Sequence, residues 1–547
     1  MLIRVAEMAV NMAVGFDLRD EPWIPVRLAG GASTRVGLRD LFRRAHEIED
    51  LELPVPPAAS GLLRLLAAMT ARIVHGDVAL DDEDLADEPP QWIRARNGVL
   101  RRGAFDADAV DEYLDDRVPE GCFDLFHPER PFLQDPRLRM ECVDGKGMPN
   151  PSGVNKLVLG RPTGVNGAVL FGHFTDTAPL PVPAAEAAWH LMAQLYYGPS
   201  GQCTPRKITT VKAGNGDAGP LRKALSYHPW GETLFTSLVL SVPQPTVGEP
   251  DPNDVCVWEA PSLPDPLGAP PPPTWPGRLL TGRARHAALL VPSPDGRAVV
   301  DAYLTWSTHQ PAVPARDPYV ILDKPKTGGD PYARPADGSR ALWRDLDALL
   351  LKGREQTQRP AVFENLPSSL RAGLRVRAYG FDQDGQQKDS SWFEATTPPV
   401  LGWQEDGPSP AMALRVAQSR EFAEQAGDRL HYAARLAWRV ATDTGLDPAA
   451  KVRLDPKKPG PWAQPAMAYY WPAAERVFWS LLDPAGLGDS VRISFVDVAL
   501  GALDAAIGAR SADVRVARAR VRARGVLRSL LRQSGIPQQV SAISGGK

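Results

Sequence analysis

A glycine-bearing segment that follows a predicted helix is the first place where this sequence could do chemistry. Residues 184–197 place apolar side chains at helical spacing, and Gly-Pro-Ser-Gly-Gln comes next. Glycines lack a Cβ atom, so the backbone there could approach the wall of a duplex groove closely and offer bare N–H groups to it. The alternative is an ordinary helix end followed by a turn. The candidate groove-binding residues, called the glycine loop below, are Gly198, Pro199, Ser200, Gly201 and Gln202.

A second polar loop, 379–388, combines neutral amides with a lysine. Amide side chains donate and accept hydrogen bonds without the desolvation penalty of a charge, which suits contacts with base edges, and a lysine can hold a phosphate. A solvated turn is the alternative. The candidate residues of this loop are Gln383, Asp384, Gly385, Gln386, Gln387 and Lys388.

Basic side chains gather in two further places. A long polar loop, 155–167, carries the cations Lys156 and Arg161, and a mobile surface loop is its alternative interpretation. The last predicted helix carries arginines that lie mostly outside its apolar face, so they could hold DNA by phosphate contacts, with a solvated helix face as the alternative. These candidate phosphate-binding residues are Arg515, Arg518, Arg522 and Arg524.

Signatures of common enzymes are missing from the sequence. Gly145-Lys146 is followed by Gly147, so no Walker nucleotide loop is present, and the histidines form neither H-E-x-x-H nor an H-D pair. Gln202 stands where a nucleophile elbow around Ser200 would need glycine. We therefore expect no catalytic residues, no bound metal and no cofactor. A nuclease or hydrolase whose catalytic residues escape these motifs is the alternative.

The length and composition indicate a folded protein of several domains. The 547 residues allow two to four domains, and 43% hydrophobic residues are enough to bury a substantial core. The net charge of −3 gives no global positive field, so any contact with nucleic acid would depend on local basic patches. The four cysteines form no C-x-x-C pair, and no apolar run approaches the about 18 residues of a membrane span. We expect a cytoplasmic protein without a signal peptide.

Up to about residue 400 the pattern is that of an α+β domain with long loops. An extended piece is expected around 17–26. A helix is expected around 62–73, with Ser60 as its cap and Gly76 as its end.

Three other segments of this mixed region carry expectations. The apolar runs 234–240 and 287–291 are typical of strands. The proline-rich stretch 242–277 cannot be the interior of a helix or sheet, so we expect a connection that runs over the surface.

After Pro410 the pattern becomes almost purely helical. Apolar residues recur at helical spacing over 412–440, and further helices are predicted at 466–482, 493–507 and 512–532. Four helices with short or medium connections indicate a C-terminal four-helix bundle, so the predicted domains are 1–400 and 401–547. The predicted buried face of the last helix comprises Val516, Ala519, Ala523, Val526, Leu527 and Leu530.

Several of these segments, in their order along the chain, resemble a known family. They are FDLRDEPWIPV at 16–26, FDLFHPERPFLQ at 123–134, the helix and glycine loop at 184–205, YGFDQDGQQK at 379–388 and the helical C-terminal region. Together they resemble the CasA family, the large subunits of the type I-E CRISPR surveillance complex Cascade. The likeness extends over nearly the whole chain from about Phe16, and its first two motifs are the most specific.

The resemblance implies a subunit that catalyses nothing itself. Members of the family combine a mixed N-terminal domain with a C-terminal four-helix bundle, and they find the protospacer-adjacent motif (PAM) in double-stranded DNA. They start strand opening beside it, which leads to the R-loop, and later recruit a helicase-nuclease. The implied partners are the backbone, small and crRNA-capping subunits of Cascade, the 5′ handle of the CRISPR RNA (crRNA), target DNA and that helicase-nuclease, with no membrane.

The family's functional loops can be carried onto this sequence. Its PAM-recognising glycine loop falls on 198–202, and its glutamine wedge, which is pushed between base pairs, falls on 383–388. Gln386 and Gln387 are the expected wedge residues, with Gln383 as the alternative register. The family segment that anchors the subunit to its neighbours and to the RNA handle falls on 155–167, where the candidates are Asn155, Lys156, Arg161 and Asn166.

Two features depart from the family pattern or leave a position open. Some members bind zinc through two cysteine pairs, whereas the corresponding stretch 169–173 reads Val-Leu-Phe-Gly-His, so we expect no zinc. A basic residue of some members contacts the PAM from a separate strand, and its counterpart falls between Ala298 and Lys326 without a single indicated position. Because minor-groove readout is degenerate, we expect several related PAMs to be accepted. A purely structural assembly subunit is a further alternative.

Overall fold

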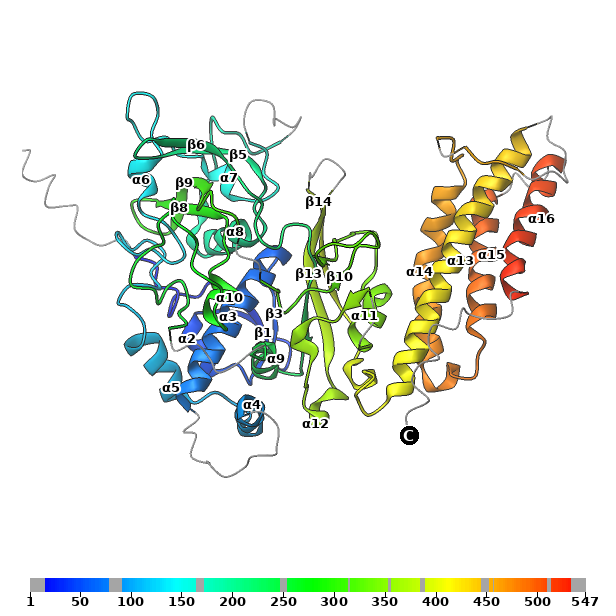
Figure 1. Cartoon of the computed structure of the whole chain (residues 1–547), viewed down its shortest axis with the longest axis horizontal. Helices are drawn as coiled ribbons and strands as arrows, with labels where there is room; N and C mark the ends of the chain where they lie inside the picture. The colour runs from blue at the N-terminus through cyan, green and yellow to red at the C-terminus, as the bar shows by residue number, and fades with distance from the viewer. Residues whose placement is uncertain are drawn as a thin grey trace, which may run out of the picture. The chain divides into compact units, whose positions relative to one another are not determined.

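The chain divides into two compact units (Figure 1). The computed structural model describes residues 15–77, 91–163, 172–245, 253–312, 315–352, 356–383, 389–443, 452–455, 457–508 and 513–532. The first unit comprises Met1–Leu342 and Lys352–Gly402, and the second comprises Trp343–Leu351 and Trp403–Lys547. A short segment that precedes the expected boundary at residue 400 therefore belongs to the second unit.

Small antiparallel sheets supply the strands of the first unit. Their strand orders are β2-β1-β3, β4-β9-β8, β14-β13-β7, β11-β10-β12 and the hairpin β5-β6. Small antiparallel sheets mixed with helices confirm the predicted α+β class. The strands are β1 (Ile24–Leu28), β2 (Ser33–Val36), β3 (Ile48–Leu51), β4 (Val182–Pro183), β5 (Gly201–Ile208), β6 (Val211–Gly216), β7 (Ser226–Trp230), β8 (His286–Pro292), β9 (Ala298–Trp306), β10 (Leu322–Asp323), β11 (Tyr332–Ala333), β12 (Thr357–Gln358), β13 (Arg375–Gln383) and β14 (Asp389–Thr396).

Helix α3 (Pro56–Asp77) is the central core helix of the first unit and packs against α8, α9, α10 and β13. It is long and apolar enough to cross a membrane, but 83% of the qualifying window is buried inside the structure. The helix begins at Pro56, so the predicted cap at Ser60 and the predicted end at Gly76 are wrong, and both residues lie within the helix. The other helices of the first unit are α2 (Leu38–Arg43), α4 (Gln91–Arg102), α5 (Ala107–Asp111), α6 (Leu138–Glu141), α7 (Val154–Leu157), α8 (Ala184–Tyr197), α9 (Leu234–Ser241), α10 (Gly277–Thr281) and α12 (Ser368–Arg371).

The two apolar runs that were predicted to be strands have different outcomes. The run at 287–291 lies in β8, which confirms the strand, but the run at 234–240 forms helix α9. Thr233 caps this helix, because its hydroxyl accepts a hydrogen bond from the N–H of Thr236 at 3.3 Å. A short run that is buried on nearly every side has no helical or strand periodicity, so its sequence pattern could not show the difference.

The two motifs that are most specific to the resemblance lie against each other. Asp17 and Asp124 form an isolated antiparallel bridge. The backbone N–H of Leu18 donates to the carbonyl of Phe123 at 3.0 Å. The N–H of Phe16 donates to the carboxylate of Asp124, 108 positions later in the chain. Hydrogen bonds thus join two segments that are far apart in the sequence.

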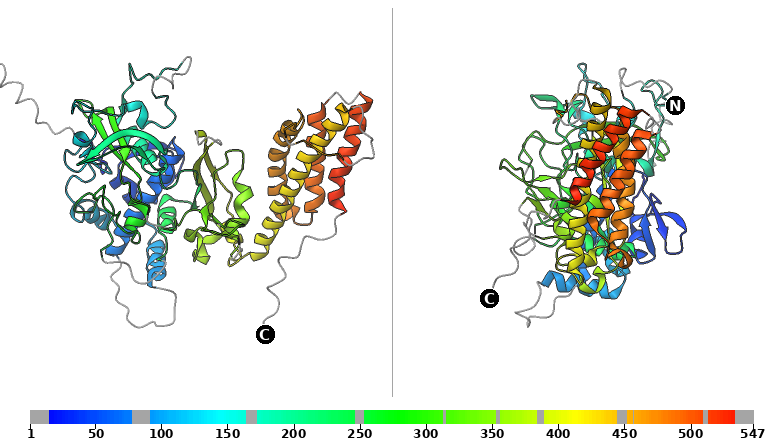
Figure 2. Two further views of the ribbon diagram at one scale, coloured as in Figure 1. Left: turned by 45° about the horizontal axis from the view of Figure 1, so that its top comes forward. Right: turned by 90° about the vertical axis from the view of Figure 1, so that its right-hand side faces the viewer.

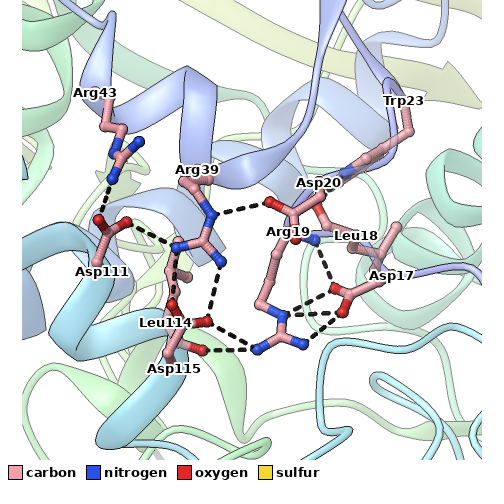
Figure 3. A network of polar contacts seen from close by, with 10 residues as sticks. All are labelled: Asp17, Leu18, Arg19, Asp20, Trp23, Arg39, Arg43, Asp111, Leu114 and Asp115. Atoms are coloured by element: carbon pink, nitrogen blue, oxygen red, sulfur yellow. Dashed lines mark hydrogen bonds and ion pairs between the residues drawn. The ribbon is translucent and has the colours of Figure 1, made fainter.

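Charged residues of the first motif belong to an ion-pair network (Figure 3). Arg19 binds Asp17 and Asp115, and Arg39 binds Asp20 at 2.9 Å as well as Asp115. The hydrogen bond from Arg39 is the main cause that lowers the pKa of Asp115. Because these charges are paired with one another, the motif stabilises the packing of α2 against the helical segment Glu112–Asp116 that follows α5.

The described part of the proline-rich stretch contains a buried aromatic anchor. Trp258 is 4% exposed, and its Nε1–H donates to the hydroxyl of Tyr113 at 2.9 Å. Its ring also packs against those of Phe123 and Phe132, with centroids 6.1 and 5.8 Å away. The prediction of a surface connection is therefore wrong around Trp258, whereas residues 261–265 are exposed as that prediction expects. Prolines exclude regular structure but do not prevent an aromatic anchor from being buried.

Four long helices make up most of the second unit and run alongside one another (Figure 2). Helix α13 packs against the other three, and α14 with α15 and α15 with α16 are further pairs. The predicted helical segments agree with these bounds within a few residues. The ring of Trp343, just before α11 (Leu346–Leu350), packs on Phe478 with centroids 4.6 Å apart. The long helices are α13 (Pro410–Thr442), α14 (Ala463–Leu482), α15 (Val491–Ile507) and α16 (Val514–Arg528).

Candidate nucleic-acid interface

The glycine loop is exposed at the end of a deeply buried helix. Helix α8 has the predicted bounds, Ala184–Tyr197, and its described side chains are buried except for Glu186. The chain then turns directly into strand β5. Gly198 is buried, whereas the following four residues, 199–202, are exposed. The surface that the sequence suggested for groove binding is therefore mostly backbone and short side chains.

Both glycines of the loop are required by their surroundings, for different reasons. The N–H of Gly198 donates to the carbonyl of Gln194 at 2.9 Å, and an added Cβ would lie 2.5 Å from that oxygen and 2.7 Å from Cε1 of His286. Its φ of −54° is open to any residue, so close approach alone requires glycine there. Gly201 has a φ of +114°, a conformation that favours glycine, with open space around it.

A buried histidine, His286, forms a hydrogen bond with the backbone of the glycine loop. Nε2 of His286, on β8, lies 3.0 Å from the carbonyl oxygen of Pro199. A carbonyl only accepts hydrogen bonds, so Nε2 carries the proton and donates it. Burial lowers the pKa of His286, which keeps the ring neutral with this tautomer in place. The loop backbone is thus fixed by a hydrogen bond that does not use its exposed side.

The hairpin β5-β6 continues from the glycine loop and is tied to the core by one arginine. Arg206 is fully buried, and its guanidinium donates to Glu141 at 2.6 Å and to Asp135 at 2.8 Å. The same group lies over the ring of Trp306, 5.3 Å from its centroid. The register pairs Gly201 with Gly216 across the hairpin. A rigid, fully paired charge thereby positions the strand on which the glycine loop ends.

The predicted wedge residues fall between two paired strands, β13 and β14. The strands pair from Arg377 with Thr396 to Gln383 with Asp389, with an irregularity between Asp382 and Gln383. Five of the candidate wedge residues, Asp384, Gly385, Gln386, Gln387 and Lys388, lie outside the described residues, and the backbone of Gln383 ends the described strand. The wedge assignment and its register therefore stay predictions.

The expected anchor loop is built differently from a continuous surface loop. Its first part is the short helix α7, and Asn155 is 1% exposed with its amide N–H donating to Asp176 at 3.0 Å. Arg161 donates to the carbonyl of Leu180 and lies 4.3 Å from the centroid of the Phe174 ring. Burial lowers the pKa values of Lys156 and Arg161.

These contacts limit what the anchor residues can offer to a partner. A side chain that is buried or engaged within the unit presents less to an outside ligand, and Lys156 and Arg161 are both half-buried. Asn166 lies outside the described residues. Gln194 of α8 also donates to the carbonyls of Lys156 and Leu157, both at 2.9 Å. The base of this loop and the glycine loop are therefore held by the same helix.

The arginines of α16 fall into two groups. Arg520 and Arg524 both bind Asp504 on α15, so they hold two helices together. Arg515 is 60% exposed with Asp513 at 3.7 Å, and Arg518 is exposed. Of the four predicted phosphate contacts, Arg524 is thus engaged internally and Arg522 is half-buried. The predicted apolar face is buried at Val516, Ala519, Ala523, Leu527 and Leu530, and Val526 is half-buried.

The resemblance places a further PAM-contacting basic residue between Ala298 and Lys326. The described part of this window contains three exposed cations. In 298–312 and 315–326, the described parts of this window, Arg316, Lys324 and Lys326 are exposed and form no ion pair with other described residues. Lys324 directly follows strand β10. These side chains are therefore the candidates for that role.

No metal site stands out in the part of the chain that the structure describes. Among those residues, no group of three or more His, Cys, Asp or Glu side chains is arranged to hold an ion. His173, at the end of the stretch that corresponds to the zinc-binding segment of some family members, is exposed.

A family model described as CRISPR-associated protein Cse1 matches residues 17–505. The chain belongs to the Cse1 family. Among curated proteins it is similar to the CRISPR-associated protein CasA/Cse1 of Thermus thermophilus, with 32% identity over 348 residues. That alignment covers 61% of this chain and 60% of the relative, so the chain spans about three fifths of the curated relative it matches. The family resemblance of the motifs is thereby confirmed.

Solved structures match this Cse1-family chain over most of its length. A chain of a CRISPR RNA-guided surveillance complex has a TM-score of 0.79 and 42% identity, covering 94% of this chain and 99% of that chain. CasA (Cse1) of Thermus thermophilus has a TM-score of 0.71 and 23% identity, covering 94% and 99%. Cse1 of Thermobifida fusca has a TM-score of 0.69 and 20% identity, covering 95% and 98%. The last two likenesses show the fold alone.

Sequence reasoning missed the residues that hold the Cse1 glycine loop in place. Arg206 and His286 come from a hairpin and a strand that flank the loop, and neither lies in a motif that was singled out. The one available signal was Arg206 itself, a charge between Pro205 and Lys207 in a segment with no neighbouring acid. Its partners, Asp135 and Glu141, lie 71 and 65 positions earlier in the chain, and local patterns cannot reveal those.

Proposed function

We propose that this Cse1-family chain is the DNA-recognition subunit of a crRNA-guided surveillance complex used in antiviral defence. In this role it recognises the PAM in double-stranded DNA, starts strand opening beside it and recruits the helicase-nuclease. The protein itself breaks no bond. Access to DNA and crRNA puts it in the cytoplasm. The family match over 17–505 and the likeness to a chain of a CRISPR RNA-guided surveillance complex support the proposal.

The observation that carries the proposal is an exposed backbone segment on a rigid support. Residues 199–202 are exposed, while Gly198 and α8 behind them are buried. The minor groove is narrow, about 6 Å wide, and it offers mainly acceptor atoms. A turn of small residues with N–H groups can enter such a groove where long side chains would obstruct it. Because A·T and T·A look alike there, the same turn would accept several related PAMs.

The wedge and the basic surfaces have complementary roles in this proposal. Gln386 and Gln387, which lie in the sequence between β13 and β14, separate the base pairs next to the PAM, with Gln383 as the alternative register. Unstacking costs a few kcal/mol per step, about the amount that guide pairing and backbone contacts can offset. Arg515 and Arg518 on the four-helix bundle contact DNA phosphates. The loop 155–167 anchors the chain to neighbouring Cascade subunits and to the crRNA 5′ handle.

The test is strand opening by the assembled complex. A target duplex carries 2-aminopurine beside the PAM, and its fluorescence reports unstacking in the presence of the companion subunits and crRNA. Replacing Gln386 and Gln387 with Ala should slow opening strongly and leave assembly unchanged. The matched control is Gln418→Ala, an exposed glutamine on α13. Opening by the double variant at the wild-type rate would remove the wedge assignment.

Two alternatives give different results in the same system. An enzyme would cleave labelled duplex when the purified chain is incubated with Mg²⁺ or Mn²⁺, and robust turnover would contradict the proposal. A purely structural subunit would support assembly while the complex bound duplexes with and without a PAM equally. A difference between those two duplexes that disappears with the Gly198→Ala variant is the outcome that we expect.

A further inference from the structure

One segment, 219–225, contacts both the start of the glycine loop and strand β13, which leads to the predicted wedge residues. On the side of the glycine loop it serves the end of α8. The N–H of Gly219 donates to the carbonyl of Gly198 at 2.9 Å, and the N–H of Leu221 donates to that of Tyr196 at 3.0 Å. Nη1 of Arg222 donates to the carbonyl of Tyr197, the residue between them, at 2.7 Å.

These three bonds matter because of where they lie. The last carbonyls of a helix have no partner within the helix and need one from elsewhere. Here the carbonyls of three consecutive residues, 196–198, all accept hydrogen bonds from the segment 219–225. An added Cβ on Gly219 would lie 2.6 Å from the oxygen of Tyr196, so the approach is as close as the backbone allows. The start of the glycine loop is therefore fixed to this segment.

The same segment is packed against the strand that leads to the wedge. An added Cβ on Gly380 would lie 2.7 Å from the carbonyl oxygen of Ala224. The guanidinium carbon of Arg222 lies 4.7 Å from the centroid of the Phe381 ring. That ring is 1% exposed and lies 5.4 Å from the ring of Tyr197. Phe381 is two residues before Gln383, where the described part of β13 ends.

The side chain of Arg222 contacts both sides, because it donates to the carbonyl of Tyr197 and lies over the ring of Phe381. A guanidinium can do this because its N–H groups donate within its plane while its face stacks on an aromatic ring. A lysine ammonium lacks the planar face, so it could keep the charge and a hydrogen bond but would lose the stacking contact.

We propose that Arg222 is a positioning residue that sets the distance between the glycine loop and the wedge hairpin. Groove binding by one loop then places the other at the adjacent base step. Successive base pairs are about 3.4 Å apart, so a small shift of one loop against the other would point the wedge at the wrong step. The inference rests on the proposed function of the two loops, and Arg222 itself need not touch DNA.

The experiment separates positioning from binding by using two substrates. The complex is assembled with wild-type chain, Arg222→Lys or Phe381→Leu. Each complex receives a fully paired target with 2-aminopurine beside the PAM, and the same target with the bases beside the PAM mismatched so that they are already open. Arg222→Lys should slow opening of the paired target by about tenfold or more, in line with the sensitivity of positioned groups to shifts of about 1 Å. Formation of the R-loop on the pre-opened target should change by less than about twofold, because no wedge is needed there.

A double-mutant comparison identifies the contact. Because Arg222 and Phe381 touch, the variant with both substitutions should be no slower than the slower single variant. Arg297→Lys, an exposed arginine in the turn between β8 and β9, is the control and should behave as wild type. The conservative Phe381→Tyr keeps an aromatic ring for Arg222 to stack on, so it should retain most of the opening rate. If the substitutions only destabilised the fold, the opening rate would not depend on whether residue 381 is aromatic.

Each result has a defined meaning. Wild-type opening rates for both Arg222→Lys and Phe381→Leu on the paired target would overturn the inference, and so would an equal loss on the two targets. If Arg222→Lys does not assemble, Phe381→Leu alone decides between these outcomes. A wild-type complex that opens duplexes with and without a PAM equally would instead contradict the proposed function, so the two failures are distinguishable.

Discussion

The glycine loop and the arginine face of α16, which comprises Arg515, Arg518, Arg522 and Arg524, are two contrasting kinds of proposed DNA-binding surface. The glycine loop offers backbone and short side chains that a buried framework holds in place, chiefly through Arg206 and His286. The arginine face offers long exposed side chains such as Arg515 and Arg518. Charges are thus buried beneath the first surface and displayed on the second. The first should therefore depend on shape and the second on ionic strength.

This contrast predicts different responses to mutation. A preorganised backbone site loses its function when its support shifts, even though the substituted residue never contacts the ligand. A flexible charged face loses binding in small and roughly equal steps, one for each cation removed. The following experiments test this contrast, beginning with the largest expected effect.

Arg206→Met should have the largest effect, because it removes the fully buried partner shared by Asp135 and Glu141, although Asp135 keeps its ion pair with the half-buried Arg137. Breaking a buried ion pair from one side costs about 3–5 kcal/mol in the free energy of unfolding. Urea denaturation of the purified chain measures this loss, and Lys207→Met, an exposed neighbour on the same strand, is the control. A loss below about 1 kcal/mol would mean that the buried charges are not the support of the hairpin.

Gly198→Ala should cost about 1–3 kcal/mol, because the new methyl group meets the carbonyl of Gln194 and the ring of His286. We also expect the complex to lose its preference for duplexes with a PAM, which competition binding measures. Gly525→Ala on α16 is the matched control, since a Cβ there meets only open space and alanine favours helix. PAM preference that survives in Gly198→Ala would show that the loop does not need its tight backbone.

Mild acid should destabilise the first unit before the second. Burial lowers the pKa of His190 to about 4, and it lowers the pKa values of His228 and His286 as well. These rings stay neutral in the folded chain but take up protons near pH 6.5 when unfolded, so the unfolded state binds more protons below that pH. Stability is fully present above about pH 6.5 and falls by up to about 1.4 kcal/mol per pH unit for each histidine as the pH decreases.

Calorimetry at pH 7.0 and 5.5 tests this difference. The second unit contains one histidine, His431, which is exposed. We therefore expect the transition of the first unit to move to lower temperature while that of the second changes little. His190→Gln should weaken the pH dependence, and His46→Gln, at an exposed site, should not. Equal shifts of both transitions would contradict the assignment to buried histidines.

Substitutions on α16 should have the smallest effect on stability and the clearest dependence on salt. Arg515→Glu and Arg518→Glu should each reduce the slope of log K against log salt by about 1 if these residues contact phosphates. Arg524→Met, which removes a partner of Asp504, should lower stability by at most about 1 kcal/mol and leave that slope unchanged. The same slope for all three variants would mean that DNA does not bind this face.

The sequence predicted elements well where periodicity was long. Helix α8 and the four helices α13–α16 each present several turns of apolar residues, so their existence and approximate bounds followed from spacing alone. The prediction was wrong for α9, where the apolar run of 234–240 is too short and too completely buried to show a period. At Ser60 a good capping residue lies inside a helix that begins at Pro56.

The positions of the candidate loops could be predicted from the sequence, but which of their side chains are free to bind a ligand could not. The glycine loop was found because glycines near a helix end are visible in a linear sequence. The sequence did not show which cations are free to bind DNA or RNA. The acid that binds Arg524 is Asp504, and the ring that Arg161 contacts is Phe174, and both come from other segments. A list of exposed cations made from sequence alone therefore includes some that the fold already uses.

The placement of Trp343 has a consequence for dissecting the protein. Its ring lies on Phe478 and near Trp471, yet it is separated from the long helices by more than fifty residues that fold elsewhere. A fragment that starts at Trp403 would lack Trp343, so the rings of Phe478 and Trp471 would be more exposed to solvent. We expect such a fragment to aggregate. A fragment meant to contain the whole second unit must therefore include 343–351 as well as the residues from Trp403 onward, because this unit is built from two separate stretches of the sequence.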